Sequence, residues 1–308
     1  MRHPVNTARS TVLAVLVLAV SWPGCGPGSP TGGRGDLAFF LDAEETITAG
    51  LVPGAEPENV VDGWTITYER FVVAIGRIHA ASRATGDTWR DDTVHVVDLV
   101  ATPATGIPLV TFEDVGTGTY DDVGFETAIV TATATRHDSV PQAIFDEMVA
   151  AGCTYLVEGS LSSPAGTSTP PGGTTMPAPS IAFRLCVPAG AVFGPCSTPD
   201  GMEGVVVTSG TTTSASLTLH GDHLWFGAFP SGDELVERRA QWLANCDLDQ
   251  DGTVTEAELM ATDAAAVFPS PEYNLSGAPA PIVDAWDFVS AQMRTQGHLN
   301  GEGECPVT

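Results

Sequence analysis

The densest group of potential ligands in this chain is the twelve-residue segment DLDQDGTVTEAE, which runs from Asp247 to Glu258. A hard divalent cation prefers several oxygen ligands, and a turning loop presents alternate residues to its centre. Gly252 stands at the sixth position, where the backbone must turn sharply. The spacing therefore predicts a calcium site, whose expected ligands are Asp247, Asp249, Asp251, Thr253, Thr255 and Glu258.

Helix signals flank this loop on both sides. Ser231 and Glu234 have the spacing of a capping box for an entering helix, which we expect to continue through Leu243. Thr255 and Glu258 form a second box, and the exiting helix is expected to end before Pro269. Over about thirty residues, this segment resembles the EF-hand family. The resemblance implies calcium binding but leaves open whether the ion is structural, regulatory or close to a catalytic site.

A second group of potential ligands lies in the stretch LTLHGDHLWF. His220, Asp222 and His223 fall within four residues at the end of a predicted strand. Two imidazoles and a carboxylate can hold zinc or copper, whereas calcium does not choose imidazole. The alternative is that the histidines cap the strand end and bond to the backbone.

Composition limits the classes of function. The 308 residues contain twelve arginines, no lysine and 38 acids, which gives a formal net charge of -26. No basic run could neutralise a phosphate backbone, so we expect no nucleic-acid partner. The common hydrolase, metalloprotease and phosphate-loop motifs are absent. The sequence thus favours a binding or structural role, with a protein or polysaccharide partner unspecified and a calcium-dependent hydrolase left open.

The first 24 residues are typical of a secretory signal peptide. Arg2 and Arg9 precede an apolar run that is too short to span a bilayer. Cys25 and the small residues up to position 35 resemble the end of a bacterial lipoprotein signal and its tether. This resemblance implies a lipid on Cys25 and a location at the outer membrane or its periplasmic face. Cleavage after Ser21 would instead give a soluble periplasmic or secreted protein.

The cysteine count bears on this choice. If Cys25 carries a lipid, five cysteines remain and one is unpaired, whereas without the lipid six could form three disulfides. Cys246 directly precedes the calcium loop and Cys305 lies in the tail. A bridge between them would pin the tail beside the loop. Cys186 and Cys196 are further disulfide candidates, and the connectivity stays open at this point.

Residues 36–228 have the pattern of many short strands separated by Gly, Pro and Asp. This pattern predicts a mainly β fold, an antiparallel β-sandwich. The exceptions are a short helix over 141–151 and a segment over 160–179, which is too poor in apolar residues to pack and is expected to be a mobile hairpin loop. Strands are also expected over 126–134 and in a last hairpin that turns at Ser209-Gly210.

Residues 229–308 are expected to form a small helical unit around the calcium loop. The segment from Pro281 to Arg294 has apolar residues at helical spacing and should cover the side of the loop unit that a second EF-hand would otherwise cover. The segment DGWTITYERF, the HGDH stretch and the EF-type loop together resemble uncharacterised proteobacterial envelope β-sandwich lipoproteins, which are distantly similar to periplasmic metal-handling β-proteins. The leading hypothesis is a calcium-binding, lipid-anchored envelope module. The alternative is a periplasmic protein that handles a transition metal through His220 and His223.

Overall fold

The computed structural model describes residues 32–56, 58–229 and 236–308. The predicted signal peptide, Cys25 and the tether up to residue 31 lie outside the described residues, and the last two tether positions, Arg34 and Gly35, belong to a strand. Gly33–Thr308 forms one compact unit, so the expected boundary at residue 228 does not separate two compact parts. In the part of the chain that the structure describes, no helix combines the length and the apolar character needed to cross a membrane.

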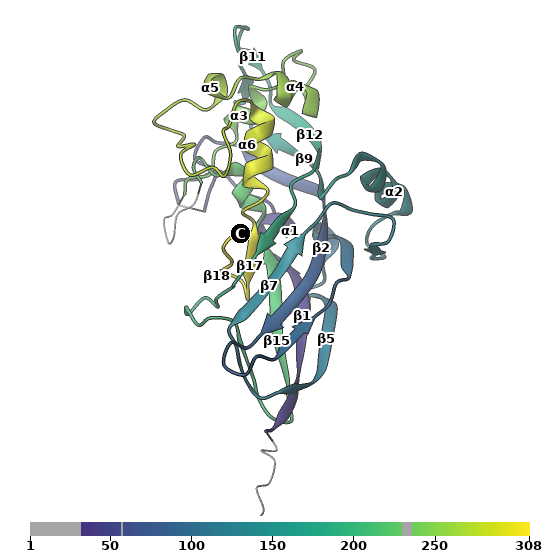
Figure 1. Cartoon of the computed structure of the whole chain (residues 1–308). Helices are drawn as coiled ribbons and strands as arrows, with labels where there is room; N and C mark the ends of the chain where they lie inside the picture. Colours follow the sequence, from purple (N-terminus) through teal and green to yellow (C-terminus); the bar gives the residue numbers. More distant parts are fainter. Residues whose placement is uncertain (1–31, 57, 230–235) are drawn as a thin grey trace, which may run out of the picture. The chain divides into compact units, whose positions relative to one another are not determined.

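The fold is mainly β, as predicted, and one of its two large sheets contains both the first and the last strands of the described residues (Figure 1). Its strand order is β18-β17-β15-β1-β5. The bounds are β1 (Arg34–Ala43), β5 (Ile107–Gly116), β15 (Thr212–Leu219), β17 (Gly297–Leu299) and β18 (Gly303–Glu304). The C-terminal tail therefore belongs to a sheet that starts at residue 34 and not to a separate helical unit.

The second large sheet is built around the long strand β2 (Thr65–Ala81). Its main path has the order β13-β7-β2-β9-β12-β16, and β3, β4 and β8 attach to it through β2 and β4. The remaining bounds are β3 (Thr88–Arg90), β4 (Val94–Asp98), β7 (Asp122–Thr127), β8 (Thr135–Arg136), β9 (Tyr155–Ser162), β12 (Ser180–Val187), β13 (Ala191–Phe193) and β16 (Thr253–Val254).

Short elements complete the described fold. Two small two-stranded sheets pair β10 (Thr167–Ser168) with β11 (Met176–Pro177), and β6 (Gly118–Tyr120) with β14 (Val205–Val207). The α-helices are α1 (Glu45–Thr48), α2 (Gln142–Ala151), α3 (Gln241–Ala244), α4 (Glu256–Ala261), α5 (Ala264–Val267) and α6 (Ala285–Gln292). The 3-10 helices are η1 (Leu99–Ala101) and η2 (Gly221–Trp225).

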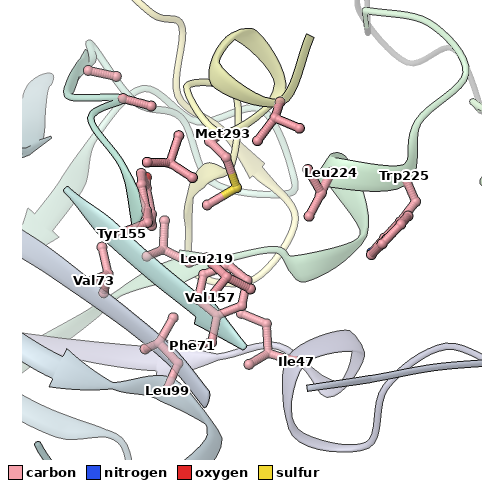
Figure 2. Packing of buried hydrophobic residues seen from close by; sticks show 14 of the residues in the cluster. Ile47, Phe71, Val73, Leu99, Tyr155, Val157, Leu219, Leu224, Trp225 and Met293 are labelled. Atoms are coloured by element: carbon pink, nitrogen blue, oxygen red, sulfur yellow. The ribbon is translucent and has the colours of Figure 1, made fainter. Parts of the chain in front are cut away.

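Alternating side chains of both large sheets share one core. In β12, the buried residues alternate with more exposed ones, which is the period of a half-buried strand. Trp89 of β3 contacts Phe112 of β5 across the two sheets, with ring centroids 5.9 Å apart. Figure 2 shows Phe71, Val157 and Leu219 meeting in this core, with Trp225 and Met293 from the C-terminal half of the chain nearby. One core thus joins the sheets to the region that carries the candidate sites.

The predicted helix over 141–151 is confirmed and covers the outer side of the second sheet. Gly152 ends α2 in the left-handed region, with φ +75°. Phe145 and Met148 belong to a second apolar cluster with residues of β2, β4 and β9. The disulfide Cys153–Cys186 links the end of this helix to β12.

Several strand predictions need correction. The sheets are not purely antiparallel, because β1 pairs in parallel with β15, β4 with β8, and β12 with β16. The strand expected over 126–134 ends at Thr127. No hairpin forms at Ser209-Gly210, because β14 pairs with β6 while β15 pairs with β1 and β17. Apolar runs identified most of these strands, but the choice of partner depends on contacts between distant parts of the chain.

The segment over 160–179 is also more ordered than predicted. It contains the small sheet of β10 and β11, and the buried Ser168 lies within it. Gln241 donates from Nε2 to the Thr167 carbonyl oxygen at 2.8 Å, and Gln250 donates to the Thr174 carbonyl oxygen at 3.0 Å. The segment therefore gains its partners from the calcium-loop region, which an analysis of its own apolar content could not detect.

The helices around the loop are shorter than predicted. The capping residues Ser231 and Glu234 lie outside the described residues, and the entering helix is only the single turn α3. The exiting helix is interrupted at Thr262, so it consists of α4 and α5. A full EF-hand helix pair is therefore not present in the described residues.

The expected disulfide between Cys246 and Cys305 is wrong. Cys305 bridges Cys196, while Cys246 is a buried free thiol. The tail pairs with β15, and a backbone bridge joins Phe193 to Val307, so the tail end lies beside Cys196. The five described cysteines thus form two disulfides and leave one thiol free, which is the count expected when Cys25 is not part of a disulfide.

Candidate metal centre

Three histidines from two paired strands meet at the end of β15. His220 and His223 follow this strand, and His298 comes from β17. His298 lies opposite Thr218 in the antiparallel register, and His220 is two residues beyond Thr218. Residues two apart on a strand share a face, so His220 and His298 are diagonal neighbours. One nitrogen from each of the three rings lies within 4.8 Å of the others.

The 3-10 helix η2 turns the chain so that His223 returns to this point. Gly221, its first residue, has its N–H bonded to Thr46 Oγ1 at 3.1 Å and its carbonyl oxygen bonded to Tyr68 Oη at 2.5 Å. A Cβ atom on Gly221 would lie 2.6 Å from Ile47, so only glycine fits this close approach. Trp225 Nε1 donates to the same Tyr68 oxygen at 2.8 Å, which fixes the other end of η2.

Hydrogen bonds determine the tautomer of His223. The Thr295 hydroxyl donates to the Gln292 carbonyl oxygen at 2.8 Å. Its oxygen therefore accepts a hydrogen bond from the N–H group at Nδ1 of His223, which lies 2.8 Å away. Nε2 of His223 then carries the lone pair. Histidines that bind metals commonly have this arrangement, in which the second ring nitrogen donates to a neighbouring oxygen.

The lone pair on Nε2 of His223 faces Nε2 of His298, which donates a hydrogen bond to it in the tautomer that carries the His298 proton on Nε2. The two Nε2 atoms are 3.4 Å apart. Two nitrogen ligands of a tetrahedral zinc ion, each at about 2.0–2.1 Å, are separated by about 3.4 Å. In addition, the buried Nδ1 atom of His298 has no hydrogen-bond partner. The spacing of these two rings thus fits a shared metal ion.

Burial keeps the rings of His223 and His298 uncharged. His220 and His223 are 4% and 5% exposed. Desolvation, followed by the neighbouring His298 and His220, lowers the pKa of His223 well below its ordinary value. Desolvation and His220 also lower the pKa of His298 to about 3. Neutral imidazole is the form that coordinates metals, so these two rings are in the binding form at neutral pH.

Asp222, which was predicted as a ligand beside the two histidines, is not part of the three-histidine group. It is 2% exposed, and its Oδ2 atom accepts from Arg238 Nε at 3.0 Å. With Glu44 and His220 it forms a separate group whose ligand atoms also lie within 4.8 Å of one another. All of these side chains line a cavity of about 1350 Å³, and Glu44 reaches it from the residue before α1.

The predicted calcium loop has a compact backbone with its carboxylates facing inward. Asp247 accepts from the backbone N–H groups of Asp251 and Gly252 at 3.1 and 3.0 Å. Gly252 has φ +87°, as the turn at loop position 6 requires. Carboxylate oxygens of Asp247, Asp249 and Glu258 lie within 4.8 Å of one another, whereas Asp251 is not in this group.

The predicted capping box of Thr255 and Glu258 is confirmed at the start of α4. Thr255 Oγ1 accepts from the Glu258 N–H, and Glu258 Oε2 accepts from the Thr255 N–H at 2.9 Å. Desolvation raises the pKa of Asp247, to which the nearby Glu258 and Asp251 also contribute. These observations describe a loop with concentrated negative charge; they do not by themselves identify a bound ion.

The loop is attached to the second sheet. Thr253 and Val254 form β16 and pair in parallel with Ala182 and Phe183 of β12. On its other side, α4 lies next to α6, and a backbone bridge joins Asp263 to Asp284. In this respect α6 takes the covering position that was predicted for the segment from Pro281 to Arg294.

Sequence reasoning missed His298 because it lies in a tail that looked helical or irregular. Strand β17 has only three residues and pairs with a strand about 80 positions earlier, so no local pattern identifies it. Gly297 gives one hint, since a Cβ atom there would lie 2.6 Å from the Phe193 ring. The sequence signal for this site is therefore a glycine that permits close approach, followed directly by one of the seven histidines in the chain.

Comparison with known proteins adds little to this description. No protein-family model matches the chain, and no curated protein matches it. Among solved structures, MbnP from Methylosinus trichosporium is similar with a TM-score of 0.31 and 12% sequence identity, over 89% of this chain and 98% of that chain. A similarity of this size carries no argument about fold or function, so the site has to be interpreted from its own geometry.

Proposed function

We propose that this protein is an exported metal-binding protein whose functional centre is a transition-metal site formed by His220, His223 and His298. The observation that carries the proposal is the 3.4 Å distance between Nε2 of His223 and Nε2 of His298, both rings being desolvated. Three imidazoles with an open fourth position suit zinc or copper. Of the three hypotheses from the sequence, the geometry favours the transition-metal one over the calcium-binding module and the calcium-dependent hydrolase.

Calcium has a supporting role in this proposal. The ligands would be those predicted from the loop, with Asp247 and Glu258 at its two ends. The pairing of β16 with β12 and the position of α6 beside α4 support a structural ion, because a bound cation would hold these contacts together. A sensor loop would instead need room for its helices to open.

Export is supported by the two disulfides, since such bridges persist in oxidising compartments. We further propose that Cys25 carries a lipid and that the protein is attached to the cell envelope in this way. The burial of Cys246 supports this, because the free thiol that remains among the described cysteines is then not accessible to Cys25 for a third bridge.

The test is a zinc and copper titration of metal-free protein in saturating calcium. His298→Ala and His223→Ala should each weaken zinc binding by at least about 100-fold, because two imidazoles cannot replace three. Thr295→Val should weaken binding by about 10-fold or more, because it removes the oxygen that orients His223.

The matched control is His137→Ala, which removes an exposed histidine outside the group. It should leave the affinity unchanged. If His298→Ala and His137→Ala both bind zinc as tightly as the unaltered protein does, the three-histidine centre is not the site and the proposal is wrong.

A further inference from the structure

The cavity beside the three histidines contains a second, separate group of ligand atoms. Glu44, His220 and Asp222 come from the N-terminal end of α1, the end of β15 and η2. Nδ1 of His220 lies 3.3 Å from Glu44 Oε2. The other ring nitrogen, Nε2, lies 3.3 Å from the Gly301 carbonyl oxygen, on the next turn of the tail. His220 thus faces the carboxylates with one nitrogen and the tail strand with the other.

Asp222 has an unused oxygen in this group. Arg238 occupies its Oδ2 atom through Nε and Nη2. The Oδ1 atom is buried and has no hydrogen-bond partner, although the residue is only 2% exposed. A buried carboxylate oxygen without a hydrogen-bond partner has lost its hydration without compensation, which destabilises the folded state. A ligand in the cavity would remove this cost.

The charges in the group also leave room for a cation. Glu44 and Asp222 are two carboxylates in a largely desolvated position, and Arg238 is the guanidinium bonded to one of them. Thr46 Oγ1 donates to Glu44 Oε2 and holds this carboxylate toward His220. One imidazole and two carboxylates form a ligand set that zinc accepts, and carboxylates favour a divalent ion over a monovalent soft one.

We propose that Glu44, His220 and Asp222 form a second cation subsite that takes a divalent first-row metal such as zinc, next to the three-histidine centre and sharing His220 with it. This proposal rests on the proposed function in one respect only, namely that His220 is a ligand in both sites. Nδ1 of His220 is the ligand on the carboxylate side. Nε2, which lies 3.3 Å from the Gly301 carbonyl oxygen, is then a ligand of the three-histidine centre as part of an imidazolate ring, whose remaining N–H proton is released to solvent when the second ion binds. The cavity then holds two metal ions side by side.

The experiment measures the zinc content of the full mature chain, with both disulfides intact, after equilibrium dialysis at buffered free zinc and in saturating calcium. Calcium occupies the loop of residues 247–258, so that zinc does not enter it. The unaltered protein should bind two equivalents of zinc. Glu44→Gln should bind one, because the amide keeps the size of the side chain but loses its charge. Glu45→Gln, at the exposed neighbouring position, should still bind two.

The outcomes separate this proposal from the proposed function. The second subsite is overturned if the unaltered protein binds one equivalent of zinc, or if Glu44→Gln binds two. The first of these results does not depend on whether a variant folds. If His298→Ala then removes the single equivalent, the three-histidine centre stands alone. If His298→Ala and His223→Ala still bind two equivalents while Glu44→Gln binds one, the three-histidine centre fails and the second subsite is supported.

Discussion

At the scale of single residues, His223 and His298 differ from ordinary buried histidines in their charge state and in their hydrogen bonds. Both rings are held without charge in a desolvated position, and Thr295 fixes which nitrogen of His223 has the lone pair. An ordinary core histidine would be expected to use both of its ring nitrogens in hydrogen bonds. Here the two Nε2 atoms face each other at 3.4 Å, a separation at which both can be ligands of one metal ion, and Nδ1 of His298 has no hydrogen-bond partner.

The low pKa of His298 predicts how the metal-free protein responds to acid. Its pKa is about 3 in the folded state and 6.5 when unperturbed, as in the unfolded chain. As pH falls from 6.5 toward 3, the unfolded state binds a proton that the folded state does not, so the free energy of unfolding falls by at most about 1.4 kcal/mol per pH unit from this residue. Urea unfolding in chelator should therefore show a steeper loss of stability in the unaltered protein than in His298→Gln. Parallel pH curves for the two proteins would contradict this expectation.

At the scale of elements, the calcium loop connects the sheet to the helix that precedes His298. Strand β16 pairs with β12, α4 lies beside α6, and α6 ends shortly before β17. Figure 1 shows α6, in yellow, leading toward β17 and β18. Elements that are each too short to be stable alone depend on such tertiary contacts. An ion in the loop should consequently raise the stability of the whole unit.

Calcium should raise the melting temperature of the protein. A free calcium concentration 100 times the dissociation constant adds about 2.7 kcal/mol to the free energy of unfolding. Asp247→Ala and Glu258→Ala should remove this increase, because they delete the ligands at the two ends of the loop. Glu272→Ala, which changes an exposed acid outside the loop, is the control and should keep the increase. Differential scanning calorimetry with calcium and with chelator measures the effect, and equal melting temperatures in the unaltered protein would rule out a structural calcium ion.

The two disulfides should differ in their effect on zinc binding. Cys196–Cys305 closes a loop of 109 residues and Cys153–Cys186 one of 33, for which chain entropy predicts contributions of about 4.7 and about 3.7 kcal/mol. Replacing both cysteines of the first bridge by alanine should also weaken zinc binding, because the tail with His298 lies just before Cys305. Replacing both cysteines of the second should leave zinc affinity unchanged. Zinc titration and urea unfolding of the two double variants check this, and equal zinc affinities would show that β17 holds His298 without the bridge.

At the scale of the whole molecule, local patterns predicted more of the fold than of the site. Apolar alternation identified strands such as β2 and β12, and Gly152 marked the end of α2, because these signals are contained in neighbouring residues. The parallel pairing of β1 with β15, the partner of Cys305 and the arrival of His298 beside His220 all depend on residues far apart in the sequence. The calcium loop could be predicted from the sequence because all of its expected ligands lie within twelve residues, and calcium binding stays a prediction.

The location of the protein is tested by changing Cys25. In the proposed lipoprotein, Cys25→Ser should move the protein from the membrane fraction to the soluble periplasmic or secreted fraction, because the lipid is its attachment. Detergent partitioning and fractionation with an antibody to the mature chain measure this distribution. If the unaltered protein is already soluble and begins after Ser21, cleavage occurs at the alternative position and the lipid anchor is excluded.

The measurement that tests the central claim most directly is elemental analysis of the mature protein, purified from its native envelope without chelators, together with His298→Ala prepared in the same way. We predict stoichiometric zinc or copper in the unaltered protein and its loss in the variant, with calcium present in both. Calcium alone in both proteins, with no zinc or copper, would contradict the three-histidine centre and return His220 and His223 to a structural role at the end of β15.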